Sequence, residues 1–161
     1  VRVYGDPCLR KRSSAIKTVG PSERMLIASM IETMHAHKGI GLAAPQVGIN
    51  EQILVADIGE GPMAMINPRI VKKSGGAPAM EEGCLSIPCV QINVKRAKRV
   101  LVSYLDENNC KVQRELKDLL ARVVLHETDH LRGKLIIDYA GLRQKLKLRK
   151  QLKQIKEISK L

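Results

Sequence analysis

The segment VLHETDHLRG, residues 124–133, decides how the rest of this sequence is interpreted. It ends a run with apolar residues at helical spacing, KDLLARVVLHETDHLRG (117–133), which predicts a helix. On a helix, His126 and His130 lie one turn apart on one face, so both can present a nitrogen to one metal ion. Glu127 flanks that face and can take a proton from a metal-bound water without being a ligand. This HExxH arrangement is favoured over a chance pair of exposed histidines, since the chain has only four histidines.

Two imidazoles need a third protein ligand. Ile136 stands where a metzincin spacing would place another histidine, and Glu157, the only downstream glutamate, lies in a basic tail. The other two histidines are two residues apart in a predicted helix, so they point to different faces. We therefore favour Cys84 in EEGCLSIP (81–88), because Gly83 lets the backbone come close and a cation stabilises a thiolate. The alternative is a buried free cysteine.

Two histidines and one cysteine leave the fourth position of a tetrahedral ion open to water, as in catalytic sites. Zinc and ferrous iron both suit these ligands, and spacing does not separate them. A hydrolase acting on a carbonyl also needs donors for the developing oxyanion. Gln46, at the end of GIGLAAPQ (39–46), and the backbone N–H of Leu85 suit that role, although the glycine-rich stretch also fits a packing loop. Asp129 is a candidate partner for an imidazole N–H.

Strand patterns alternate with three predicted helices along the chain, which favours a single α+β domain over residues 1–161. The first helix covers 21–39, with Ser22 as its cap and Met25 in its apolar stripe. The other expected elements are a loop at 39–48, a strand at 52–58, a strand, turn and approach to a loop over 65–88, a hairpin at 98–116, and helices at 117–133 and 141–161 with Leu142, Leu146, Leu152 and Ile155 on the apolar side of the last.

Composition is that of an ordinary globular protein, with 44% hydrophobic and 27% charged residues. The chain has no Phe or Trp and only three Tyr, so the core must be aliphatic and stacking on nucleobases is disfavoured. We expect no membrane span and no signal peptide. Four cysteines do not resemble a disulfide framework, which favours a reducing compartment.

Positive charge is concentrated at the C-terminal end. Between residues 143 and 160 there are eight Lys or Arg and one acid, which supplies +7 of the net charge of +12. Such a run is either the solvated face of a terminal helix or a contact for an anionic surface such as RNA.

The segments GIGLAAPQVG (39–48), EEGCLSIP (81–88) and HETDHLRG (126–133), in this order and at these separations, closely resemble peptide deformylases of the bacterial type with a basic C-terminal helix. The first residues GDPCLRKRSS, the INP at 66–68 and KRVLVSYLDE are also similar, so the resemblance covers nearly the whole chain. It implies antiparallel sheets and hairpins around a central helix carrying HExxH, plus a C-terminal helix. It also implies removal of the N-formyl group from the initiator methionine of nascent polypeptides, releasing formate.

Carried over position by position, the resemblance implies a role for each matching residue. The metal ligands would be Cys84, His126 and His130; Glu127 would be the general acid/base; Gln46 and the Leu85 amide would stabilise the tetrahedral intermediate; Ile40, Gly41, Glu82 and Gly83 would line the substrate groove, with Val123 near the methionine pocket. One divalent ion per chain is implied, ferrous iron in vivo, which zinc or nickel can replace. The resemblance also implies a monomer in the bacterial cytosol, with an organelle as the alternative. It further implies that residues 142–161 contact ribosomal RNA.

Three positions depart from the family pattern. Leu125 stands where glutamine is common, Cys89 stands where glycine is usual, and QINV (91–94) lacks an aromatic residue. These departures leave the ligands intact and concern groove shape and sensitivity to oxidation. Two other function classes compete with the deformylase: an HExxH metallopeptidase acting on other amides, and a basic RNA-binding domain with a structural metal.

Overall fold

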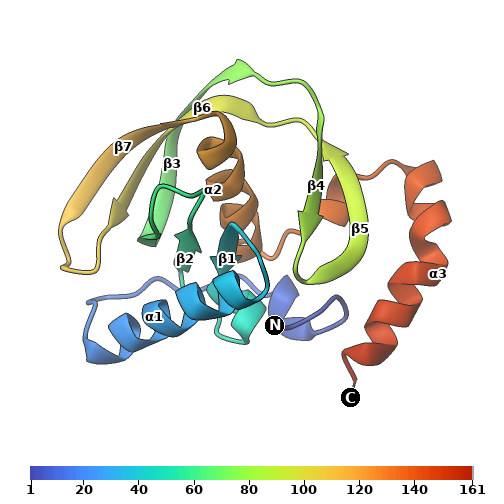
Figure 1. Cartoon of the computed structure of the whole chain (residues 1–161), viewed down its shortest axis with the longest axis horizontal. Coiled ribbons are helices and arrows are strands. Elements are labelled where there is room, and N and C mark those ends of the chain that lie inside the picture. Colours follow the sequence, from blue (N-terminus) through green and yellow to red (C-terminus); the bar gives the residue numbers. More distant parts are fainter. Residues whose placement is uncertain (161) are drawn as a thin grey trace.

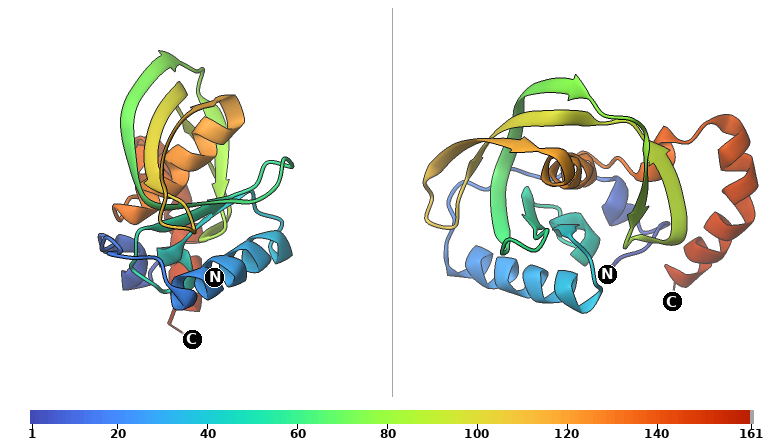
Figure 2. Two further views of the ribbon diagram at one scale, coloured as in Figure 1. Left: turned by 90° about the vertical axis from the view of Figure 1, so that its left-hand side faces the viewer. Right: turned by 45° about the horizontal axis from the view of Figure 1, so that its top comes forward.

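Helix α2 (Asp118–Leu131) passes through the middle of the molecule, and strands curve around it (Figures 1 and 2). The computed structural model describes residues 1–160. Every residue of α2 from 121 to 128 is buried, as are its last two. The chain leaves the helix through Gly133 at a φ of +73°, where a Cβ atom would lie 2.5 Å from the carbonyl oxygen of Arg10. Only glycine fits this exit, which explains the stop predicted from the sequence.

Five strands within residues 1–160 form an antiparallel sheet in the order β1-β2-β3-β6-β7. Leu54, Val102 and Leu116 of this sheet pack against Val124 and Leu125 of α2 in a core without Phe or Trp, as the composition predicted. The hairpin predicted at 98–116 is confirmed. The strands are β1 (Gly41–Ala43), β2 (Ile53–Ala56), β3 (Met63–Gly76), β6 (Ala97–Leu105) and β7 (Lys111–Lys117).

A second, two-stranded sheet lies on the other side of α2 and consists of β4 (Met80–Cys84) and β5 (Ile87–Val94). The expectation of a loop at CLSIP is therefore wrong for most of its length: only Leu85 and Ser86 form a turn. Strand β5 buries Ile87, Val90, Ile92 and Val94 against the segment that follows α2 and against α3, which gives the hairpin its own core. This hairpin positions Cys84 at the end of β4.

Helix α1 (Pro21–Ala36) covers the base of the molecule and buries Ile27, Met30 and Met34. Met25 is 72% exposed, because it lies two residues before Ile27 and hence on the opposite side of the helix. The predicted cap is also wrong. The N-cap is Gly20, whose N–H donates to the Glu23 carboxylate, and Ser22 lies inside the helix.

Helix α3 (Leu142–Ile158) lies at one end of the molecule, apart from the large sheet (Figure 1). The predicted helix at 141–161 corresponds to it, and residue 161 lies outside the described residues. Ile155 is buried and Leu152 packs beside it, but Leu142 and Leu146 are exposed. Leu146 precedes Ile155 by nine residues, which places it on the opposite face. In residues 1–160 no helix has the length and apolar character needed to cross a membrane. The predicted α+β class, with antiparallel sheets around the HExxH helix and a C-terminal helix, is confirmed.

Candidate active site

Three side chains from two elements meet beside α2. The imidazoles of His126 and His130 have ring centroids 5.1 Å apart, and β4 delivers Cys84 from the other side. One donor atom of each lies within 4.8 Å of the others, and Cys84 Sγ is 3.2 Å from His130 Nε2. The three residues named from spacing are thus brought together. Two nitrogens and one sulfur at these separations fit one tetrahedral zinc or ferrous ion.

The carboxylate of Glu82 holds one of these imidazoles in place. It accepts hydrogen bonds from His126 Nδ1 (3.0 Å), from Nε and Nη2 of Arg96 (2.6 and 2.8 Å), and from Arg122 Nη1 (2.7 Å). Burial raises the pKa of Glu82, but the hydrogen bonds and charges of His126 and Arg96 outweigh it and lower the pKa to about 2. This bond engages Nδ1 and leaves Nε2 as the ring nitrogen that can coordinate a cation, which is the usual way that a protein orients a histidine ligand.

Asp129, which the sequence suggested as an imidazole partner, has a different role. Its Oδ2 accepts from Arg96 Nη1 at 2.9 Å and from the Tyr139 hydroxyl at 2.7 Å. The prediction for Asp129 is therefore corrected: it supports Arg96, which in turn supports Glu82. Sequence reasoning missed Arg96, Arg122 and Tyr139. No motif in the sequence marks them, because their contacts depend on how separate elements pack in the folded chain.

The two imidazoles are electrostatically distinct. Burial lowers the pKa of His130 well below its ordinary value, so this ring is neutral and has a lone pair to offer. Burial also acts to lower the pKa of His126, but hydrogen bonds with Cys84 and Glu82 and the nearby Glu127 charge raise it well above the ordinary value. A cation bound among these donors would take the place of that proton.

Glu127 lies beside the donor cluster and is 4% exposed. Burial raises the pKa of its carboxyl group to about 7. Among residues 1–160, no group forms a hydrogen bond with Oε2, so that oxygen is available to a proton of water or substrate. Gly41 makes room for this carboxylate, since a Cβ atom at position 41 would lie 2.5 Å from Oε1. A carboxyl group that titrates near neutrality is suited to general acid/base chemistry.

Gln46 is buried on a short 3₁₀ turn (Ala44–Val47) next to the cluster. Its Oε1 accepts from the Ala43 N–H at 2.8 Å, and its Nε2 lies 3.2 Å from Ser86 Oγ and 3.7 Å from Cys84 Sγ. Leu85, the other residue suggested as an oxyanion donor, follows Cys84 in the turn between β4 and β5. Both donors therefore lie next to the proposed ligands.

A cavity of about 600 Å³ opens onto these groups. Within the described residues, β1 pairs only with β2 and β4 only with β5, so each leaves one edge free, and residues of both strands line the cavity. Glu82 borders it too, but four hydrogen bonds already occupy its carboxylate. All five residues expected to line a substrate groove border this cavity, namely Ile40, Gly41, Glu82, Gly83 and Val123. Other residues that border the cavity include His37, Met80, Pro88 and Leu119, for which the sequence predicted no role in a groove.

The proteins and the family model to which this chain is similar are all peptide deformylases, and each matches most of the chain. The family model of polypeptide deformylase matches residues 1–146. The peptide deformylase of Thermotoga neapolitana is 46% identical over 155 residues, which are 96% of this chain and 94% of that protein. The crystal structure of the enzyme from Thermotoga maritima is 46% identical, with a TM-score of 0.84 over 86% of this chain and 94% of that one. The structure of the Thermus thermophilus enzyme has a TM-score of 0.93 at 33% identity, over 99% of this chain and 98% of that one.

Proposed function

The chain belongs to the polypeptide deformylase family, which removes N-formyl groups from nascent polypeptides, and we propose that this chain does so with one divalent ion held by Cys84, His126 and His130. The observation that carries the proposal is the meeting of these three donors beside a buried glutamate in a cavity. Ferrous iron is the proposed ion, with zinc or nickel able to replace it. When bound, the ion supplies Lewis-acid chemistry: it polarises a carbonyl group and acidifies water.

Glu127 would move the proton. Its free Oε2 takes a proton from the water that attacks the formyl carbon, and then delivers this proton to the methionine nitrogen as the C–N bond breaks. The products are formate and a free amine. A pKa of about 7 allows the carboxyl group to perform both transfers near neutral pH.

Gln46 and the Leu85 amide would stabilise the carbonyl oxygen as charge develops on it. The Nε2 of Gln46 is 3.7 Å from Cys84 Sγ, and Leu85 is the next residue along the chain from that sulfur. Donors held in a buried site cost no reorganisation during the reaction, which makes them effective.

The free edges of β1 and β4 would receive the start of the polypeptide as an extended strand. Ile40 and Gly41 lie on one side of this groove, and Glu82 and Gly83 on the other. Val123, on the face of α2 that borders the cavity, would contact the methionine side chain. Backbone pairing of this kind tolerates any sequence after the first residue.

The test uses protein prepared anaerobically with iron, with metal content measured alongside. Formyl-Met-Ala-Ser should release formate, and acetyl-Met-Ala-Ser should not be hydrolysed. Cleavage of the Met–Ala bond in either peptide would instead support the rival HExxH metallopeptidase.

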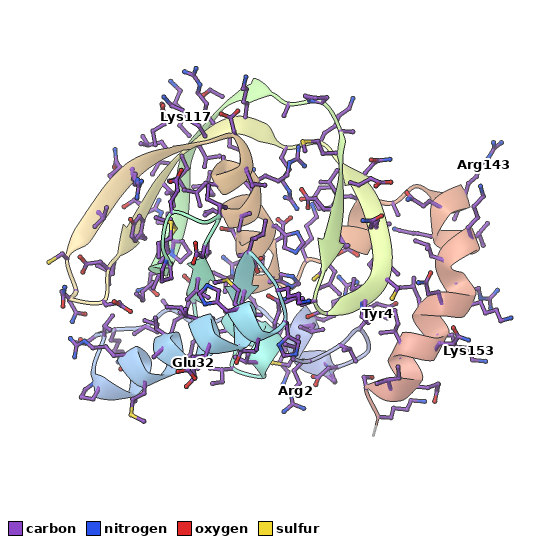
Figure 3. The ribbon with its side chains drawn as sticks, viewed as in Figure 1. Arg2, Tyr4, Glu32, Lys117, Arg143 and Lys153 are labelled. Atoms are coloured by element: carbon purple, nitrogen blue, oxygen red, sulfur yellow. The ribbon has the colours of Figure 1, made fainter. Side chains whose placement is uncertain are left out.

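Helix α3 would bring the enzyme to its substrate by contacting ribosomal RNA. Arg143 and Lys153 project away from the body of the protein (Figure 3), and the basic residues along the helix are exposed. The other side of the helix is anchored by Ile155 and by a hydrogen bond from Gln151 to the carbonyl of Cys89. A nascent formylated chain exists only where bacterial-type translation takes place, so the bacterial cytosol is the proposed location. The monomeric state and the single domain stay predictions.

Cosedimentation with ribosomes tests this contact. Glutamine at Lys145, Lys147, Lys150 and Lys153 removes four charges while keeping Ile155, and should weaken binding and lower the slope of log K against log salt by up to about 3. A matched control replaces four exposed lysines elsewhere, Lys17, Lys72, Lys73 and Lys111, and should have a much smaller effect. Equal effects of the two sets would show that α3 is an ordinary solvated face.

A further inference from the structure

We infer that the Ser86 hydroxyl is a positioning group for the Gln46 amide, setting the direction of the hydrogen-bond donor that faces the reacting carbonyl. Ser86 is fully buried in the turn between β4 and β5. Its Oγ lies 3.2 Å from Gln46 Nε2. The inference rests on the proposed function, in which Gln46 stabilises the developing oxyanion.

The oxygen and the nitrogen of the Gln46 side-chain amide have different partners. Oε1 accepts the Ala43 N–H, which determines which end of the amide carries the oxygen. Nε2 has two hydrogens. One donates to Ser86 Oγ at 3.2 Å, and the other makes a longer hydrogen bond to Cys84 Sγ at 3.7 Å. Ala43 therefore selects the amide orientation, and Ser86 fixes the torsion that aims the second hydrogen into the site.

The N-terminal segment ties these two residues together from behind. The N–H of Arg2 donates to the carbonyl of Gln46 at 2.6 Å, and the N–H of Tyr4 donates to the carbonyl of Ser86 at 2.7 Å. Arg2 and Tyr4 lie near the turn of the β4–β5 hairpin (Figure 3). The two loops that carry the oxyanion donors are thus held at a fixed separation by backbone bonds, and the Ser86 hydroxyl adds a side-chain bond between them.

This arrangement assigns a function to a serine that neither binds metal nor touches substrate. Without the hydroxyl, the Gln46 amide would keep its Ala43 bond and its long bond to Cys84 Sγ, but would lose the shorter of the two bonds that restrain Nε2. A misdirected donor stabilises the transition state less and leaves the binding of the substrate unchanged. The loss should therefore appear in kcat and not in KM. Since one neutral hydrogen bond is involved, we expect kcat to fall roughly tenfold for Ser86→Ala, compared with about 100-fold or more for loss of the Gln46 donor itself.

The experiment is a double-mutant cycle on the iron enzyme with formyl-Met-Ala-Ser. It compares Ser86→Ala, Gln46→Ala, the double variant and Ser86→Thr, which keeps the hydroxyl. Ser86→Ala should lower kcat in the wild-type background and have no further effect when Gln46 is alanine. Ser86→Thr should recover most of the activity. Ser13→Ala is the matched control: Ser13 is also buried, but its hydroxyl has no partner in residues 1–160, so kcat should be unchanged.

A second readout does not depend on turnover. In ¹⁵N spectra of the zinc-loaded protein, the Gln46 side-chain amide protons should exchange with solvent faster in Ser86→Ala than in wild type. Wild-type kcat in Ser86→Ala, or an equal loss in both backgrounds, would overturn the inference. Failure of the proposed function would look different, because the wild-type enzyme itself would release no formate.

Discussion

Replacing Gly41 with alanine tests the position of Glu127 without altering any proposed ligand. The φ of Gly41 lies outside the left-handed region, so alanine is not strained by the backbone. Its Cβ would, however, lie 2.5 Å from Glu127 Oε1 and 2.7 Å from Val123 Cγ1. Ordinary contacts begin at 3.4 Å, so the carboxylate must retreat by about 0.9 Å.

A displacement of this size defines the expected loss. Misplacing a catalytic group by roughly 1 Å can cost about 100-fold in rate, and removing a general base altogether costs about 10² to 10⁴-fold. We therefore expect kcat for formyl-Met-Ala-Ser to fall about 100-fold in Gly41→Ala. Metal content should stay at one ion per chain, because the atoms nearest the new methyl group belong to Glu127 and Val123.

Gly76→Ala provides the matched control. Gly76 is also a strand glycine with an ordinary φ, and within residues 1–160 a Cβ atom at this position would meet no atom within 4 Å outside its chain neighbours. Its kcat should be that of the wild type. Wild-type kcat in Gly41→Ala would refute the placement of Glu127 as the group that transfers the proton. Loss of metal from that variant would refute the reasoning that the new methyl group displaces Glu127 and Val123 but leaves the proposed ligands in place.

Three further substitutions probe the ligands, their support and a distant ion pair. Cys84→Ser should weaken metal binding strongly. Loss of a hydrogen-bond partner of a ligand costs about 10- to 100-fold in metal affinity, and loss of the ligand itself should cost more. Stoichiometric metal with normal turnover would exclude Cys84 as a ligand. Glu82→Gln should destabilise the fold by about 3–5 kcal/mol in chemical denaturation, because buried Arg122 loses its counter-charge and Arg96 keeps only that of Asp129. It should also weaken metal binding through His126. Arg10→Met removes the partner of Asp138. Burial acts to raise the pKa of Asp138, but the hydrogen bond from Arg10 outweighs it, so the pKa is lowered overall. Since the folded pKa is below the unfolded one, the stability difference from wild type, at most about 1 kcal/mol, should be present at pH 7 and vanish as the pH falls below the carboxyl range; a difference that persists in acid would contradict this ion pair.

The parts of the site that depend on local geometry could be predicted from the sequence. His126 and His130 share a face because helix geometry fixes the relation between positions four apart. Cys84 followed by elimination, since the chain offers few alternatives. The prediction for Asp129 was wrong because its neighbour Arg96 comes from a segment 33 residues away, and only the folded chain shows that Glu82 is the partner of His126.

The predictions of the fold were least accurate where the structure depends on which strands pair and which elements pack together. The sequence predicts a loop at CLSIP, whereas Pro88 lies within β5, where the register between β4 and β5 shifts. Pro68 likewise lies at a register shift between β3 and β6, the kind of position where a sheet tolerates proline. The position of helix α3 is confirmed, but Leu142 and Leu146, predicted to share its apolar side with Ile155, are exposed, because no local pattern shows which side faces the hairpin.

The central claim is that Cys84, His126 and His130 hold the ion while Glu127 moves the proton. Glu127→Gln separates these two roles, because it keeps the shape of the side chain and removes its ability to accept a proton. Metal content and formate release are measured on the same anaerobic sample. One ion per chain with turnover lowered by about 10² to 10⁴-fold is the predicted result. Loss of the ion, or formate release at the wild-type rate, would contradict it.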